Sequence, residues 1–191
     1  MTSSPSGREP PARTPRTDPR HRVEHPPTPK PNRPRDPDAP PKPRRPRDDL
    51  GRPLPWDAEN TLTMEDYDSL PLERNHELAM ESFNAARFFP AHEAWESAWK
   101  QARERPETKG DVEFFKGLSQ LGAGYTHLLR GNQHGAYTLL RRGAGRIQRY
   151  GTDHRGIEAE ALARIALRQA KQIEDAERSG APSPKLRFPT V

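Results

Sequence analysis

The fold is decided by residues 114–140, which read FFKGLSQLGAGYTHLLRGNQHGAYTLL. The apolar side chains in the first part of this stretch recur at helical spacing, as Phe114, Leu118, Leu121, Tyr125 and Leu128. This spacing predicts an amphipathic helix from a capping Asp111 to Arg130. No part of the chain shows the sustained alternation of a strand, so the expected fold class is all-α.

The next two residues predict a tight turn. Gly131 suits the end of one helix and Asn132 suits the cap of the next, so an antiparallel helix is expected from there to about Tyr150. On the side of the first helix opposite its apolar line, four residues follow at spacings i, i+3, i+7 and i+10: Gly117, Gln120, Gly124 and His127. An interior Gly costs up to about 1 kcal/mol relative to Ala. Two on one face therefore predict that another backbone packs closely there.

Three further helices follow from the same periodicity. They are expected from about Pro71 to Ala86, from about Pro90 to Arg103, and around 162–176. The chain should therefore fold as a compact bundle of about five helices.

Proline and charge separate the ends of the chain from this bundle. Residues 1–55 hold 17 of the 23 Pro and carry 13 basic against 7 acidic side chains, whereas the remaining residues carry 19 basic and 20 acidic ones. The overall charge of +5 therefore belongs to the first segment. We expect a disordered Pro/Arg-rich tail over 1–55, a linker over 56–69, the helical domain over 70–180 and a C-terminal tail over 181–191.

The composition also bears on the cellular compartment in which the protein is expected. The chain has no Cys, which excludes disulfides and Cys-ligated zinc. The N-terminal region has no apolar run that could serve as a signal-peptide core or a membrane span. A cytoplasmic protein with no membrane partner is therefore expected.

One group of polar residues needs partners. His92 sits within the apolar stripe of the helix over 90–103, and Glu96 follows one turn later. An unpaired buried polar group costs about 1 to 3 kcal/mol, so we expect partners on the next helix. The predicted polar pocket lies between these two helices and comprises His92, Glu93, Glu96, Gln120 and His127, with His76 as a neighbour and Trp95 and Trp99 as lining aromatics that serve the core first.

Two interpretations of this pocket stay open. In the first, His92, Glu96 and His127 bind a divalent metal and leave a position for water, which would suit a metal-dependent hydrolase. In the second, the same groups form a hydrogen-bonded network that fixes helix register. The HEAWE stretch lacks the two-His spacing of zinc proteases, and no recognised catalytic motif is present.

The stretches FNAARFFPAHEAWESAWK (83–100) and 114–140 together resemble the domain of unknown function 309 (DUF309) family. That family shows a phrase F-N-x-G-x-Y/F-x-x-A-H-E-x-x-E-x-x-W, then F-x-x-G-L-I-Q-x-A-A-x-x-x-H and a G-N-x-x-G-A turn. The positions that match are Phe83, Asn84, Phe88, Ala91, His92, Glu93, Glu96, Trp99, Gly117, Leu118, Gln120, His127, Gly131, Asn132, Gly135 and Ala136. Departures are Ala86 in place of Gly, Pro90 in place of a helix former, and Ser119 in place of an aliphatic residue. The resemblance covers about 70–175 and implies an all-helical bundle without an established activity.

The sequence leaves three functions open. The first is an uncharacterised cytosolic domain with a ligand or metal pocket. The second is a protein-interaction module built from helical hairpins. The third is a nucleic-acid accessory protein that uses the basic tail and the Arg142, Arg146 and Arg149 line, although the tail's acidic residues and lack of aromatics count against it. Homo-oligomer formation stays open with all three.

Overall fold

The computed structural model describes residues 45–191, and within them the fold is all-α, as predicted. The expected disordered tail lies outside the described residues up to position 44. The five α-helices are α1 (Leu72–Asn84), α2 (Phe88–Glu104), α3 (Val112–Leu129), α4 (Gln133–Ile147) and α5 (Ala159–Ser179). Short 3-10 helices are η1 (Tyr67–Ser69), η2 (Pro106–Asp111) and η3 (Gln148–Tyr150).

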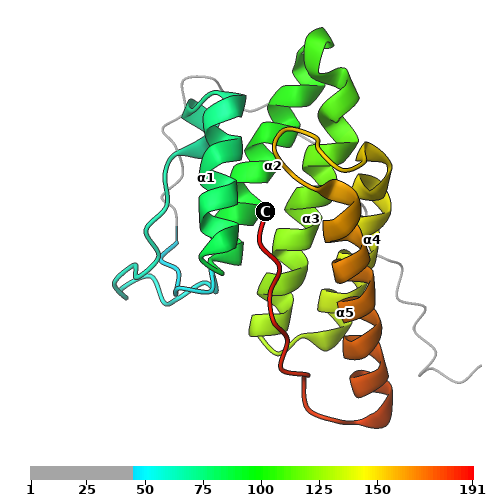
Figure 1. Cartoon of the computed structure of the whole chain (residues 1–191). Coiled ribbons are helices and arrows are strands. Elements are labelled where there is room, and N and C mark those ends of the chain that lie inside the picture. The colour runs from blue at the N-terminus through cyan, green and yellow to red at the C-terminus, as the bar shows by residue number, and fades with distance from the viewer. Residues whose placement is uncertain (1–44) are drawn as a thin grey trace, which may run out of the picture. The chain divides into compact units, whose positions relative to one another are not determined.

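Each α-helix packs against the next one in sequence, and α3 lies between α2 and α4 (Figure 1). The predicted apolar line of α3 forms the centre of the core. Phe114, Leu118, Leu121 and Tyr125 are fully buried there, and Leu128 is nearly so. The sequence pattern therefore located the central helix correctly.

The glycines of α3 allow close approach on two sides. A Cβ at Gly117 would lie 2.5 Å from Ile147 Cγ2 and 2.9 Å from the Gly143 carbonyl oxygen, so this position faces α4. A Cβ at Gly124 would lie 3.1 Å from the backbone nitrogen of Leu140, also on α4. Gly122 instead faces α2, because its Cβ would lie 3.0 Å from the His92 nitrogen. The predicted close backbone contact is confirmed, and the backbone that meets Gly117 and Gly124 is that of α4.

The predicted turn between α3 and α4 is also confirmed. Gly131 has a φ of +79°, the left-handed conformation that favours Gly, and the Asn132 side chain accepts a 2.8 Å hydrogen bond from the Gly135 N–H. These two residues reverse the chain within one turn. They place α4 directly against α3.

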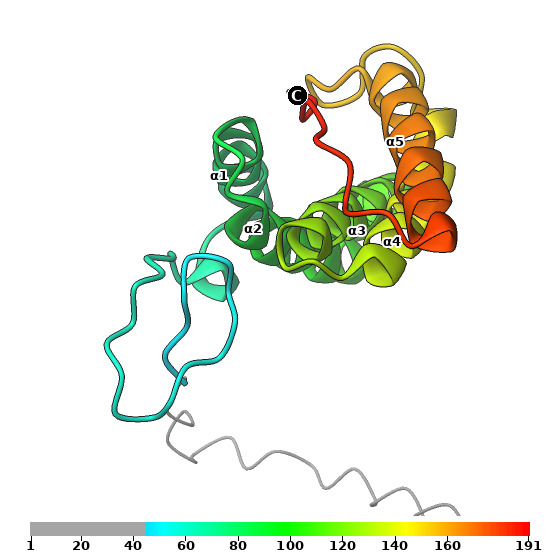
Figure 2. The same ribbon diagram turned by 90° about the horizontal axis from the view of Figure 1, so that it is seen from below.

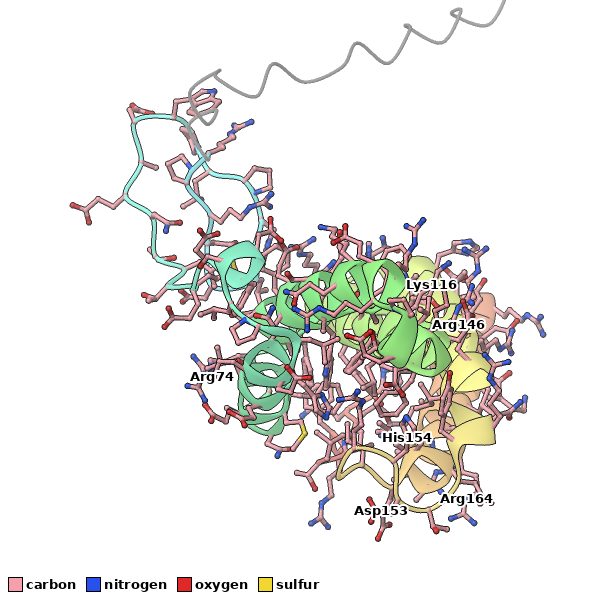
Figure 3. All side chains as sticks on the ribbon, turned by 90° about the horizontal axis from the view of Figure 1, so that it is seen from above. Arg74, Lys116, Arg146, Asp153, His154 and Arg164 are labelled. Carbon is pink, nitrogen blue, oxygen red and sulfur yellow. The ribbon has the colours of Figure 1, made fainter. Side chains whose placement is uncertain are left out.

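Asp111 occupies the N-cap position of α3, as predicted, but its side chain makes no capping hydrogen bond. It has helical dihedrals and ends η2. It accepts instead from Arg155 through two guanidinium nitrogens, at 2.7 and 3.0 Å, and lies 2.7 Å from His154 Nε2. His154 and Arg155 belong to the loop between α4 and α5 (Figure 3). This carboxylate therefore ties that loop to the start of α3.

Helix bounds differ from the predicted ones by a few residues. The second helix begins at Phe88 and includes Pro90, which the first turn tolerates because its N–H groups have no intrahelical partner. The fourth ends at Ile147, and the remaining residues to Tyr150 form η3. Among the helices over 45–191, none is both long enough and apolar enough to cross a membrane.

The segments on either side of the helices contact them. Arg130, which caps the C-terminal end of α3, donates two hydrogen bonds, of 3.0 and 2.6 Å, to the Leu50 carbonyl, and Gly51 packs on the Phe89 ring. At the other end, Phe188 packs on Phe88 and further core residues. The proposed boundaries at 55 and 180 stay predictions.

We predict that Gly117→Ala destabilises the protein by about 1 to 3 kcal/mol, because the added methyl group overlaps the α4 backbone. The matched control is Gly145→Ala on α4, where a Cβ meets no atom within 4 Å. This change should stabilise by up to about 1 kcal/mol through helix propensity. Urea unfolding of the two variants measures both effects, and equal shifts of the same sign would contradict the close packing.

Candidate functional site

Three polar side chains gather on one turn of α2. The His92 Nε2 lies 3.6 Å from Glu93 Oε1 and 3.5 Å from Glu96 Oε2. One ligand atom from each residue can be chosen so that all three lie within 4.8 Å of one another. All three side chains are partly exposed, so they form a site that solvent reaches.

The orientation of the His92 ring is set by α3. Its Nδ1 lies 3.1 Å from the Ser119 carbonyl oxygen and 2.9 Å from Ser119 Oγ. Nδ1 can donate to this carbonyl oxygen or accept from the Ser119 hydroxyl, depending on the tautomer of the ring. In the tautomer with the proton on Nδ1, the Nε2 lone pair faces the two carboxylates. Gly122 makes this contact possible, because it lets the two helices approach at His92.

Glu96 is held on its other side by Lys100. The Lys100 Nζ lies 3.0 Å from Glu96 Oε1, which leaves Glu96 Oε2 for His92. Burial alone would lower the pKa of Lys100, but the hydrogen bond and the charge of Glu96 outweigh it and raise that pKa above its ordinary value. Lys100 is therefore a stable cation that fixes one orientation of the Glu96 carboxylate.

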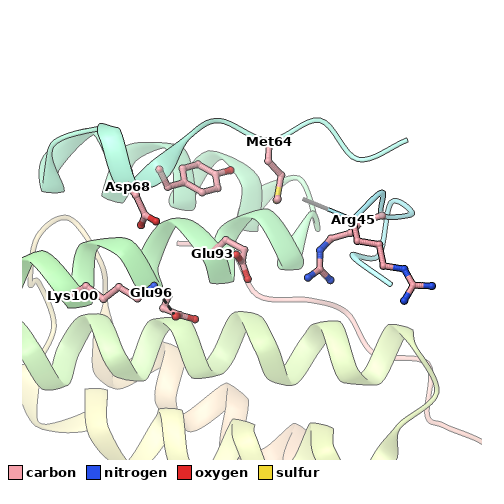
Figure 4. Close-up of a pocket in the computed structure, with 8 residues that line it drawn as sticks. Arg45, Met64, Asp68, Glu93, Glu96 and Lys100 are labelled. Atoms are coloured by element: carbon pink, nitrogen blue, oxygen red, sulfur yellow. Dashed lines mark ion pairs between the residues drawn. The ribbon is translucent and has the colours of Figure 1, made fainter. Parts of the chain in front are cut away.

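The carboxylates open into a pocket of about 250 Å³ between α2 and the chain that precedes α1 (Figure 4). Its lining residues are Arg45, Arg47, Met64, Tyr67, Asp68, Glu93, Glu96 and Lys100. The far wall is tied to α2 through Ser97, whose hydroxyl donates to the Tyr67 carbonyl at 3.0 Å and lies 3.1 Å from Asp68 Oδ1. The pocket thus has acidic groups on both walls, Glu93 and Glu96 on α2 and Asp68 on η1, and basic groups at its ends.

The structure places the two predicted partners on α3 elsewhere. Gln120 Oε1 accepts a 3.0 Å hydrogen bond from Arg146 Nε on α4. His127 Nδ1 lies 2.9 Å from Asn132 Nδ2, and burial, helped by the charges of Arg130 and His92, lowers its pKa. Neither residue belongs to the group of ligand atoms found in the described chain. The structure brings Glu93 to His92 and Glu96 instead.

His76 and Trp95 form a separate buried pair. The Trp95 Nε1–H donates to His76 Nδ1 at 3.1 Å, and His76 Nε2 lies 2.9 Å from the Arg155 carbonyl oxygen. Since that carbonyl can only accept, Nε2 carries the proton and Nδ1 accepts. Trp95 is fully buried in the core. Both ring nitrogens of His76 are used, so this pair is a structural link between α1, α2 and the Arg155 loop.

Trp99 lies one turn beyond Glu96 and is half-buried. Its ring has the Arg103 guanidinium 5.6 Å and the Lys116 ammonium 5.1 Å from its centroid. Its buried Nε1 has no hydrogen-bond partner within the described residues. Trp95 and Trp99 are both absent from the lining of the pocket above, where Tyr67 supplies the aromatic surface.

The predicted basic line is divided between α4, which carries Arg142 and Arg146, and η3, which carries Arg149. Arg146 pairs with Glu113 as well as with Gln120, and the Arg149 guanidinium lies 5.4 Å from the Tyr150 ring centroid. Arg142 is exposed. Figure 3 shows Arg146 on α4, the helix that faces α3. Two of the three guanidinium groups are thus engaged within the chain.

Sequence reasoning missed the pocket wall and the role of Ser119. The wall residues Arg45, Met64 and Tyr67 precede the helical periodicity, so no pattern pointed to them. Ser119 was noticed only as a departure from the family phrase, although a polar residue facing His92 is a usable signal. Glu93, adjacent to His92, was expected only as a member of a larger cluster.

Comparison with protein-family models matches residues 77–139 to the family described as Domain of unknown function (DUF309). The resemblance predicted from the sequence is therefore confirmed over residues 77–139, which match the model of that family. Neither the comparison with curated proteins nor that with solved structures gives a match. His92, Glu93, Glu96 and Ser119 all lie within the matched residues, whereas Arg45 and Tyr67 precede them.

We predict that His76 makes stability depend on pH in mildly acidic solution. Burial, which outweighs the hydrogen bond to Arg155, lowers the pKa of His76 below its ordinary value of 6.5. The unfolded chain therefore takes up the proton first, and the free energy of unfolding falls as the pH drops below about 6.5. A His76→Gln variant should lose this part of the dependence, measured by urea unfolding between pH 8 and pH 5.

The control is His134→Gln, which changes an exposed His on α4. It should keep the wild-type dependence. If His76→Gln and wild type show parallel curves, the buried neutral state of His76 is contradicted.

Proposed function

We propose that the DUF309 domain of this chain binds a divalent metal ion through His92 Nε2 and the carboxylates of Glu93 and Glu96. The observation that carries the proposal is that one ligand atom from each of the three residues lies within 4.8 Å of the other two. In the tautomer that donates from Nδ1 to the Ser119 carbonyl, the Nε2 lone pair of His92 is available to a metal ion. Three electron-pair donors converge on one point, which is the arrangement that a cation stabilises.

The spacing of the three groups supports a metal better than a shared proton. The separations of 3.5 and 3.6 Å exceed the 2.7 to 3.2 Å of ordinary hydrogen bonds. Ligands about 2.1 Å from a tetrahedral zinc ion lie about 3.4 Å apart, close to the spacing found here. The two distances from His92 Nε2 therefore match the edge length of a zinc coordination tetrahedron.

The surrounding groups favour the same function. Ser119 orients the imidazole and Lys100 orients Glu96, which are the roles that outer-shell partners play at metal sites. One imidazole with two carboxylates suits Zn²⁺ or Mn²⁺. All three ligands come from one turn of α2, so the opposite half of the coordination sphere faces away from that turn, where the carboxylates line the pocket.

A metal bound here would polarise a water molecule or a substrate oxygen in the pocket, which is the chemistry of metal-dependent hydrolases. The protein's own part is to hold the ligands and to place Lys100 and Arg45 at the pocket rim. We expect the domain to act in the cytoplasm. Hydrolase activity is a second step of this proposal, and it requires that the metal ion binds at this site.

Metal binding is tested by equilibrium dialysis of the full chain against Zn²⁺ and Mn²⁺, followed by elemental analysis. We expect one ion per chain in the wild type. His92→Gln and Glu96→Gln should each weaken binding at least as much as the roughly 10- to 100-fold that loss of an outer-shell partner costs. Glu77→Gln, on an exposed position of α1, is the matched control and should bind as the wild type does.

His127→Ala separates the two ligand sets. The set predicted from sequence contains His127, whereas the set that the structure brings together contains Glu93. We expect His127→Ala to keep its metal and Glu93→Gln to lose affinity. Equal metal content in the wild type and His92→Gln would remove the proposal and leave the hydrogen-bonded network as the role of these residues.

A further inference from the structure

Residues 185–191 form an extended segment that lies across the helices between α1 and α5 (Figures 1 and 2). Its side chains divide into two sets. Leu186, Phe188 and Val191 pack against the core, and Pro189 is buried with them, whereas Lys185, Arg187 and Thr190 are exposed. The segment thus presents an aliphatic residue, Phe-Pro and a second aliphatic residue to one surface of the domain.

The centre of that surface is an aromatic socket. The Phe188 ring lies 4.8 Å from the Phe88 ring and 5.5 Å from the Tyr125 ring, measured between centroids, and is steeply inclined to both. Edge-to-face contacts of this kind favour an aromatic ring over an aliphatic side chain of similar area. The socket therefore selects Phe at this position of a bound segment.

Next to the socket, a buried side-chain amide forms a hydrogen bond with the backbone of the 185–191 segment. The Gln169 Nε2 donates a 2.8 Å hydrogen bond to the Arg187 carbonyl oxygen. Its Oε1 accepts a 2.7 Å hydrogen bond from the Tyr125 hydroxyl, and burial raises the pKa of that hydroxyl so that it stays a donor. Tyr125 thus fixes which end of the Gln169 amide faces the segment.

A second side-chain amide forms hydrogen bonds with the backbone of residue 191. The Asn84 Nδ2 donates to the Val191 carbonyl oxygen at 2.8 Å, and the Val191 N–H donates to Asn84 Oδ1 at 2.7 Å. One side chain thus satisfies both backbone groups of one residue, as a neighbouring strand would. This pairing recognises an extended backbone and is independent of the side chain at position 191.

We propose that Asn84, Phe88, Tyr125 and Gln169 form a peptide-recognition site, of which residues 185–191 are the resident ligand. The partner is an extended peptide of another protein that presents Phe-Pro between two aliphatic residues, spaced as in this segment. Such a peptide meets the same socket and the same two amides, and it displaces the resident segment. The site is distinct from the proposed metal ligands and does not depend on them.

The connection to α5 allows the segment to leave. Helix α5 ends at Gly180, whose φ of +69° closes it, and residues 181–183 are exposed. Ala181 donates a 2.9 Å backbone hydrogen bond to the Ala176 carbonyl at the helix end, and its own carbonyl accepts a long 3.4 Å hydrogen bond from Gln133. A tethered ligand competes at an effective concentration in the millimolar range. Partner peptides therefore bind the intact chain only when their affinity or concentration overcomes this competition.

The test uses a fluorescently labelled peptide with the sequence of residues 184–191, blocked at both ends, and measures anisotropy with the full chain. Phe188→Ala removes the anchor of the resident segment and leaves the site intact. We expect this variant to bind the peptide at least tenfold more tightly than the wild type. Adding Asn84→Ala to it should weaken binding about tenfold, because two hydrogen bonds are lost. A peptide with Ala in place of Phe should not bind.

Circular dichroism establishes that each variant is folded, and a second measurement needs no variant. In the ¹⁵N-labelled wild type, millimolar peptide should move the Val191 amide signal toward its position in a free segment. An unmoved signal overturns the proposal, as does a folded Phe188→Ala variant that does not bind. A wild type that is dimeric by light scattering, with a monomeric Phe188→Ala variant, would assign the site to a second copy and overturn the choice of partner.

Discussion

The arrangement of the domain depends on how closely α3 approaches both of its neighbours. On one side, Gly117 meets Gly143 of α4, and on the other, Gly122 meets the backbone of His92. These contacts leave no room for a side chain, so the distance between helices is set by backbone atoms. His92 Nδ1 contacts the Ser119 carbonyl and hydroxyl across this same interface, so helix packing also sets the orientation of the His92 ring.

The local sequence pattern was sufficient to predict the helices and the central position of α3. The apolar line from Phe114 to Leu128 and the pair Gly131 and Asn132 each express a constraint within one or two turns, and the structure contains both. His92 and Glu96 were also expected to meet, because residues four apart share one face of a helix. Features that depend on one helix alone could therefore be predicted from the sequence of that helix.

The partners between helices could not be predicted in the same way. Gln120 was expected opposite His92, but it shares a face with Gly117 and Gly124, and that face meets α4. The side toward α2 carries Ser119 and Gly122, which are displaced around the helix axis from Gln120. Periodicity gives the relative angles of side chains on one helix, whereas the direction in which that helix faces its neighbours depends on the whole core. The pocket wall and the site for Phe188 also depend on contacts between residues far apart in the chain.

The pocket near His92 has two walls of different origin. Glu93, Glu96 and Lys100 stand on α2 within the family match, while Arg45, Arg47, Met64 and Tyr67 come from chain that precedes it. The two walls touch through Ser97, Tyr67 and Asp68. The composition of the pocket therefore depends on two separate parts of the chain. Tyr67 belongs to the core as well as to the pocket, whereas Arg45 is exposed, so Arg45 is the wall residue whose replacement would change the charge of the pocket with the least effect on the core.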